Sequence, residues 1–284
     1  MTALPNIPRL YTALAECLAV GIYALPLGIR FGKTATIAAS AAWALALSAF
    51  LQATGRVPLA WWIPCMAAAV GIQYLYLWVT RTISLLEAGY VCARAFVLAE
   101  LAASAEWQLH CFLWPQRSGA DGLSLLLLVV VYGGVFGCIW VLEHKHTSPK
   151  GHIVISGKAA LVAVVMAAMV FAVSNLLFLG DREVDMSVYY IRTLVDLAGV
   201  LILTVQHEQL REAALHSELA AMDEVLHRQY EQYKRSKEGI RLINSRYHEL
   251  KIQIADIRAE RDRAKQDAAL ARMESCLLYT SPSP

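Results

Sequence analysis

The chain has 284 residues, of which 57% are hydrophobic and only 17% are charged. Soluble domains average roughly 45–50% apolar and about 25% charged residues, so this composition excludes an ordinary water-soluble globule, a disordered chain and a disulfide-rich secreted scaffold. The charge is divided unevenly: residues 1–205 hold 12 Lys/Arg and 10 Asp/Glu, whereas residues 206–284 hold 13 of each sign. The sequence therefore predicts an apolar piece followed by a charged one. The net charge of +2 gives no bulk affinity for nucleic acid.

Seven apolar runs precede residue 207, and each has about the length of a membrane span, roughly 20 residues. Five of them carry almost no charge, namely 10–28, 34–52, 58–80, 122–142 and 155–178. The runs 85–113 and 186–206 contain several ionisable residues, and we count them as spans because the apolar residues between those charges are unsuited to water. We therefore expect an all-α membrane protein, with about seven transmembrane helices in residues 1–205 and a long cytoplasmic helix in residues 206–272.

The short loops predict the orientation of these spans. Lys and Arg in short loops favour the cytoplasmic side. With a cytoplasmic C-terminus, five basic residues fall in inner loops and four in outer segments, which is a small difference. The last two loops are clearer, because residues 144–152 are basic and residues 181–185 are acidic. We expect a multi-pass protein in the lipid bilayer, with its C-terminus in the cytoplasm. The outer loops are too short for a ligand domain, so a signal is expected to be a small molecule or peptide sensed within the bundle.

Ionisable residues within the spans are costly and are candidates for function. Arg192 and Asp196 are spaced i,i+4 and share one helix face. They are candidates for a signal relay to the cytoplasm, although a purely structural ion pair explains the same spacing. Glu100 and Glu106 flank the small-residue run at 101–105, which permits close helix packing. They are further candidates for the relay.

Cysteine usage indicates no metal site. Five of the six cysteines lie in apolar runs and none belongs to a C-x-x-C pair, so a disulfide framework and a zinc site are not expected.

The charged piece has the pattern of a coiled coil. From residue 203 to residue 272 there is no proline, and Gly239 is the only glycine, which is typical of a long helix. Ten of thirteen a and d positions between residues 219 and 261 are apolar or tyrosine. We call these a and d residues the seam. A seam of this kind needs a partner helix, so a homodimer through residues 206–272 is expected. A plain structural stalk also explains the seam.

His248 occupies a b position in this register, beside the seam residue Tyr247 and exposed to solvent. A neutral imidazole is a good phosphoryl acceptor, and an adjacent carboxylate, here Glu249, can orient the ring or take its proton. Lys251 can balance the charge of a phosphate. A solvated histidine on a helix face is the alternative interpretation of the position alone.

The run from Lys237 to Ile254, KEGIRLINSRYHELKIQI, resembles the phosphoacceptor helix of bacterial GHKL-type sensor histidine kinases, the multi-span receptors related to quorum-sensing kinases. That helix reads approximately S-K-E-x-I-x-L-I-N-x-K-Y-H-D-L-K-x-Q-I, so Arg246 and Glu249 are conservative departures. Residues 94–109 and 192–199 resemble the fourth and last spans of the family more loosely. The resemblance covers nearly all of the chain up to residue 272.

The resemblance implies that His248 accepts the γ-phosphoryl group of ATP and that Glu249 is the neighbouring acid or base. Lys251 and Gln253 belong to the same motif with supporting roles. The phosphoryl group then passes to an aspartate of a response regulator. The chain is expected to be part of a histidine kinase, a protein-histidine phosphotransferase, in the inner membrane of a bacterial cell.

One departure from the family concerns the nucleotide. Such kinases continue into an ATP-binding domain, which has an Asn-bearing helix and glycine-containing sequence boxes around the nucleotide. No such boxes follow residue 272. We therefore expect ATP and Mg²⁺ to belong to a missing domain of the parent, and this chain to be a truncated fragment that is inactive alone. Residues 273–284 look non-native, like translated adaptor sequence. The alternative function is a non-enzymatic membrane receptor or scaffold whose coiled coil recruits a partner.

Overall fold

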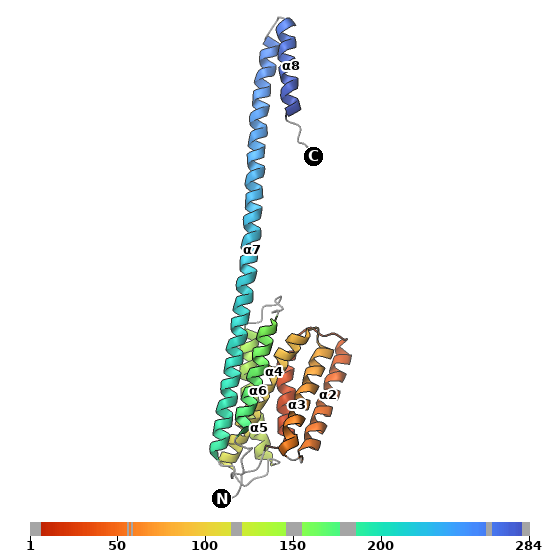
Figure 1. Ribbon diagram of the computed structural model, residues 1–284, viewed down its shortest axis with the longest axis vertical. Helices are drawn as coiled ribbons and strands as arrows, with labels where there is room; N and C mark the ends of the chain where they lie inside the picture. The colour runs from red at the N-terminus through yellow and green to blue at the C-terminus, as the bar shows by residue number, and fades with distance from the viewer. Residues whose placement is uncertain are drawn as a thin grey trace. The chain divides into compact units, whose positions relative to one another are not determined.

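The computed structural model describes residues 7–55, 57, 59–114, 121–145, 155–176, 186–259 and 263–279. Within these residues the regular structure is helical (Figure 1), with one isolated β-bridge between Ile29 and Arg81. The helices are α1 (Arg9–Ala24), α2 (Lys33–Thr54), α3 (Leu59–Thr80), α4 (Leu85–Leu113), α5 (Gly122–Lys145), α6 (Gly157–Leu176), α7 (Met186–Ala259) and α8 (Arg263–Tyr279).

The chain divides into two compact units, Met1–Ala214 and Leu215–Pro284. The first unit is a helical bundle, and the boundary lies within ten residues of the change in charge density that the sequence places at residue 205. Each of the seven apolar runs coincides with a helix or with the first part of one, so the all-helical class is confirmed. The run at 85–113 has the same limits as α4.

Five of the described helices are long and apolar enough to cross a membrane: α2, α3, α5, α6 and α7. The other two expected spans do not meet both conditions within the described residues. Helix α1 has 16 residues, fewer than the roughly 20 that a span needs, and α4 is long but carries several charges.

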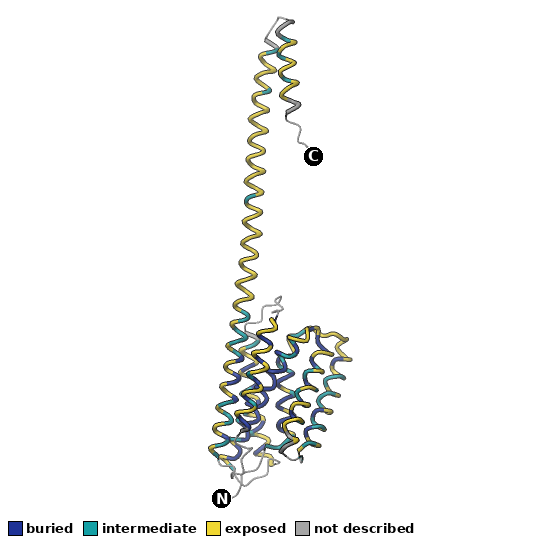
Figure 2. Tube along the Cα trace, viewed as in Figure 1, coloured by how far each residue is buried: buried dark blue, intermediate teal, exposed yellow. Residues whose placement is uncertain are grey.

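Helices α1 and α4 are also the most enclosed helices of the bundle. Nine of the 16 residues of α1 and 19 of the 29 residues of α4 are buried, whereas the apolar stretches of the five candidate spans are only 17–33% buried. Figure 2 shows the buried positions gathered in the middle of the bundle. Helix α4 packs against α1, α3, α5 and α6. Because these neighbours cover it, α4 can carry charges that a lipid-facing helix would not tolerate.

Two loops that the sequence places on the inner side of the membrane, between α1 and α2 and between α3 and α4, meet at one end of the bundle. The backbone N–H of Thr82 donates to the carbonyl of Gly28 at 2.9 Å, and that of Arg30 donates to the carbonyl of Thr80 at 3.0 Å. Gly28 allows this approach, since a Cβ there would lie 2.4 Å from the hydroxyl oxygen of Thr82. The meeting of these loops agrees with placing them on one side of a membrane. The orientation rests mainly on the loops at 144–152 and 181–185, and of these only residues 144 and 145 are described.

A capping box starts helix α4. The Ser84 hydroxyl accepts from the backbone N–H of Glu87 at 3.3 Å, and the Glu87 carboxylate accepts from the backbone N–H of Ser84 at 2.8 Å. This reciprocal pair satisfies two amides that lack helical partners. Glu87, which the sequence counts among the charges of a span, therefore has a role at the helix end.

In the second unit, α7 runs from Leu215 to Ala259 with nearly all described side chains exposed (Figure 2). Helix α7 is described to Ala259 and α8 from Arg263, and residues 260–262 lie outside the described residues, so the expected single helix to about residue 272 stays a prediction. Helix α8 takes in residues up to Tyr279, part of the segment that looks non-native.

Candidate functional site

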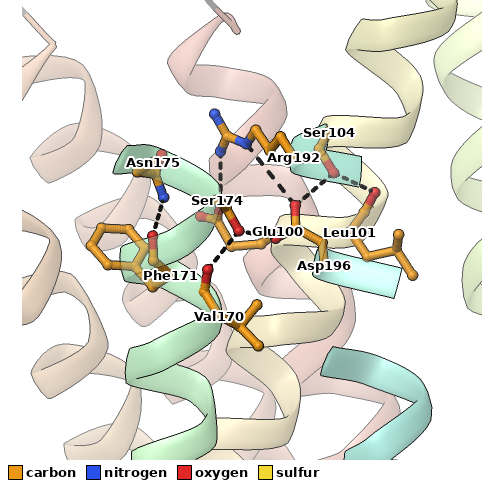
Figure 3. A network of polar contacts seen from close by, with 9 residues as sticks. All are labelled: Glu100, Leu101, Ser104, Val170, Phe171, Ser174, Asn175, Arg192 and Asp196. Carbon is orange, nitrogen blue, oxygen red and sulfur yellow. Dashed lines mark hydrogen bonds and ion pairs between the residues drawn. The ribbon is translucent and has the colours of Figure 1, made fainter. Parts of the chain in front are cut away.

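A cluster of polar side chains lies inside the bundle where α4, α6 and α7 meet (Figure 3). We call it the core polar cluster, and it consists of Glu100 and Ser104 on α4, Ser174 on α6, and Arg192 and Asp196 on α7. Three of these five residues were candidates from the sequence. The two serines were not, because a serine in an apolar run carries no signal of its own in the sequence.

Of its contacts with Glu100 and Asp196, Arg192 makes the shorter one to Glu100 on another helix. Its Nη2 donates to Oε2 of Glu100 at 2.6 Å, and its Nε lies 4.0 Å from Oδ2 of Asp196. The i,i+4 contact expected from the sequence is therefore present, but the shorter bond joins α7 to α4. The side chains of Arg192 and Glu100 are 12% and 5% exposed, so the charges are largely shielded from water and depend on one another.

Asp196 is fully buried and accepts from two serine hydroxyls. Ser104 donates to its Oδ2 at 2.8 Å, and Ser174 donates to its Oδ1. Each hydroxyl also lies within hydrogen-bond distance of a carbonyl on its own helix, Leu101 at 3.2 Å for Ser104 and Val170 at 2.6 Å for Ser174. A hydroxyl has one hydrogen, so each serine can donate either to the Asp196 carboxylate or to the backbone carbonyl of its own helix. The hydrogen bonds from α4 and α6 to Asp196 can therefore be made or lost by reorienting two hydroxyls, while the Arg192–Glu100 ion pair still joins α7 to α4.

Gly199 brings α7 close to the same two helices. A Cβ at this position would lie 2.6 Å from Cγ2 of Val170 on α6 and 3.0 Å from Cγ1 of Val97 on α4. Such distances are below normal van der Waals contact, and valine side chains are stiff at χ1. The position therefore requires glycine, and it lies one turn beyond Asp196.

A second polar group joins α4, α5 and α7 farther along the last helix. Arg94 is buried and pairs with Glu143, while Nε2 of His207 lies 3.8 Å from the other carboxylate oxygen. The Arg94 guanidinium lies 4.5 Å from the ring centre of Tyr23 and 5.8 Å from that of Tyr90. The Tyr90 hydroxyl is 3.4 Å from Nδ1 of His207.

The sequence did not identify this second group as a site. Arg94 and Glu143 are 49 positions apart, and Tyr90 and His207 are 117 apart. No helical or heptad period links such positions. The only available signal was the cost of an arginine within an expected span, which points to a partner without naming it.

The remaining buried carboxyls of the bundle have different surroundings. Glu16 on α1 accepts from the amide of Gln73 on α3 at 2.5 Å. Glu106 on α4 is fully buried, but the structure does not bring it to the core polar cluster. The grouping of Glu106 with the other three relay candidates is thus not reflected in the contacts.

In the second unit, His248 lies on an exposed face of α7, in agreement with the expected b position. Its neighbour Glu249 accepts from Nη1 of Arg246 at 3.0 Å. Lys251 and Gln253 are exposed on the same helix. Eight large seam residues on this helix are 41–68% exposed, and no described residue covers them: Leu219, Met222, Leu226, Tyr233, Ile240, Ile243, Tyr247 and Ile254.

Comparison of the chain with protein-family models, curated proteins and solved structures found no match.

Proposed function

We propose that this chain is the membrane-sensor and phosphoacceptor part of a bacterial two-component histidine kinase. In this proposal seven helices cross the inner membrane, α1 and α4 as the enclosed pair, and the C-terminal unit is cytoplasmic. The observation that carries the proposal is the run from Lys237 to Ile254, which resembles a phosphoacceptor helix and includes His248 on an exposed helix face.

The chemistry needs few groups. The imidazole of His248 attacks the γ-phosphorus of ATP, a P–N bond forms, and the P–O bond to ADP breaks. Glu249, which follows in the chain, orients the ring or takes its proton. Phosphoryl transfer depends mainly on positioning and charge stabilisation, and Lys251 supplies a positive charge nearby while Gln253 supports the motif. ATP and Mg²⁺ are held by a domain outside this chain, and the phosphoryl group passes to an aspartate of a response regulator.

The exposed seam supports the proposal that two copies pair along this helix. Burial of apolar area contributes about 25 cal/mol per Å², so eight exposed seam residues give a strong reason for association. A b-position residue flanks such a seam without filling it. His248 therefore stays accessible to a kinase domain and to a response regulator when the helix is paired.

The core polar cluster supports a role in signal relay. Helix α7 carries Arg192 and Asp196 near its beginning and His248 farther along the same helix. A small or peptide signal that changes how α4 and α6 hold α7 would alter the state of the phosphoacceptor helix.

The proposal is tested by sequencing the gene beyond residue 272 and labelling the encoded protein with ATP. A nucleotide-binding domain in the same reading frame, with label on His248, is the expected result. An intact parent gene that encodes no such domain would favour the non-enzymatic receptor or scaffold. Label from ATP on the purified 284-residue chain alone would contradict the assignment of ATP binding to another domain.

A further inference from the structure

Glu106 has unusual surroundings for a carboxyl inside a membrane bundle. It lies on α4 and is 0% exposed, and no group among the described residues makes a hydrogen bond to either of its carboxylate oxygens. The other buried carboxyls differ from it in this respect. Glu100 bonds to Arg192, Asp196 accepts from two serines, and Glu16 accepts from Gln73.

The groups around Glu106 do not supply a charge that would balance a carboxylate. The titratable side chains that interact with it electrostatically are Tyr11 on α1, Tyr132 on α5 and Cys111 on α4. All three are neutral groups in their ordinary state. Among the described residues, no arginine or lysine makes a hydrogen bond to either Glu106 oxygen.

One neighbouring hydrogen-bond donor, the Tyr132 hydroxyl, is already engaged. The Tyr132 hydroxyl donates to the backbone carbonyl of Tyr11 at 2.9 Å. His110 lies one turn beyond Glu106. Its ring stacks on the Trp107 ring with the two ring centres 4.7 Å apart, and its ring centre lies 6.1 Å from that of Trp114, edge to face. The carboxyl is therefore fully buried in the region where α1, α4 and α5 pack together.

A carboxylate ion in such a place is far more costly than the neutral acid, because burial of an unpaired charge is not compensated by hydrogen bonds or a counter-ion. A hard metal cation does not solve the problem, since such ions need about six or more oxygen ligands, and the described residues contain no group of three or more metal-ligating side chains. A proton needs only the carboxyl itself.

We propose that Glu106 is a proton-binding site of the bundle, occupied at neutral pH. The ligand is a proton. Loss of the proton places a negative charge where α1, α4 and α5 meet, and this disfavours their packing. Use of the site as a signal input, sensitive to alkaline pH, rests on the sensor function proposed above, whereas the occupancy of the site does not.

Infrared difference spectroscopy of the full chain in lipid bilayers tests the proposal directly. A protonated carboxyl has a C=O stretching band that a carboxylate lacks. The spectrum of the wild type minus that of Glu106→Gln at neutral pH should contain this band, because glutamine replaces the neutral acid with little change of shape. A matched control is Glu100→Gln, whose difference spectrum should instead contain carboxylate bands, since Glu100 pairs with Arg192.

A Glu106→Gln difference spectrum with carboxylate bands and no protonated band would overturn the proposal. A pH titration of the wild type alone keeps the test valid if a variant does not fold. Protonated-carboxyl intensity should be present at neutral pH and decrease as the pH is raised, and its absence at neutral pH would also overturn the proposal. Neither measurement depends on phosphotransfer, so a failure here is distinct from a failure of the kinase assignment.

Discussion

Replacement of Arg192 by methionine should destabilise the bundle more than replacement of Glu100 by glutamine, although the two residues form one ion pair. Arg192→Met removes the cation that contacts both Glu100 and Asp196 and leaves these two carboxylates close together, with the charge of Arg9 still acting on Glu100. Glu100→Gln leaves Arg192 with Asp196, whose Oδ2 lies 4.0 Å from its Nε. The difference in destabilisation between the two variants follows from this second carboxylate, Asp196.

The burial of the pair sets the expected magnitudes. Removal of one partner of a buried ion pair costs about 3–5 kcal/mol, and the 12% exposure of Arg192 places this case near the lower end. We expect Arg192→Met to lower the free energy of unfolding by about 3 kcal/mol, a factor of more than about 100 in the equilibrium constant. Glu100→Gln should cost about 1 kcal/mol, the net value of a hydrogen bond.

Reversible unfolding in mixed lipid–detergent micelles, followed by circular dichroism, measures these differences. The double variant Arg192→Met with Glu100→Gln should cost at least about 1 kcal/mol less than the sum of the single changes, because the two groups are in contact. Equal costs for the two single variants, or additive costs in the double variant, would refute the argument from the cluster.

The other predictions concern close packing, the second polar group and the seam. Gly199→Ala should lower the free energy of unfolding by about 1–3 kcal/mol through overpacking, whereas Gly133→Ala, whose Cβ would meet open space, should not; equal effects in the same unfolding assay would contradict the close approach. Arg94→Lys should cost about 1–2 kcal/mol through loss of its contacts with two tyrosine rings, and no change in unfolding would refute it. Ile254→Lys should shift the chain from dimer to monomer in analytical ultracentrifugation, and Ile252→Lys, at an f position, should not; the reverse pattern would refute the register.

The positions of the helices along the chain were largely predictable from the sequence, because an apolar run long enough to cross a bilayer is a local signal. The limits of α4 matched the run 85–113, although its charges made it the weakest candidate by hydropathy. Its charges reflect enclosure by neighbouring helices, which a hydropathy pattern does not report.

The partners within the candidate site were less predictable. The spacing of Arg192 and Asp196 revealed a shared face, but the bond from Arg192 to Glu100 joins positions 92 residues apart. Tertiary packing decides which of several buried charges meet, and a single sequence has no periodic signal for it. The unpartnered state of Glu106 was invisible for the same reason, since it depends on what α1 and α5 place beside it.

The most direct test of the account is to locate the phosphorylated residue in the full reading frame that encodes this chain. His227 is a matched control, because it also lies at an exposed b position of α7, three heptads before His248. Membranes containing the wild type or His227→Gln should acquire label from ATP, and His248→Gln should acquire none while remaining dimeric. Label retained in His248→Gln, or lost in His227→Gln, would contradict the assignment of His248 as the phosphoacceptor.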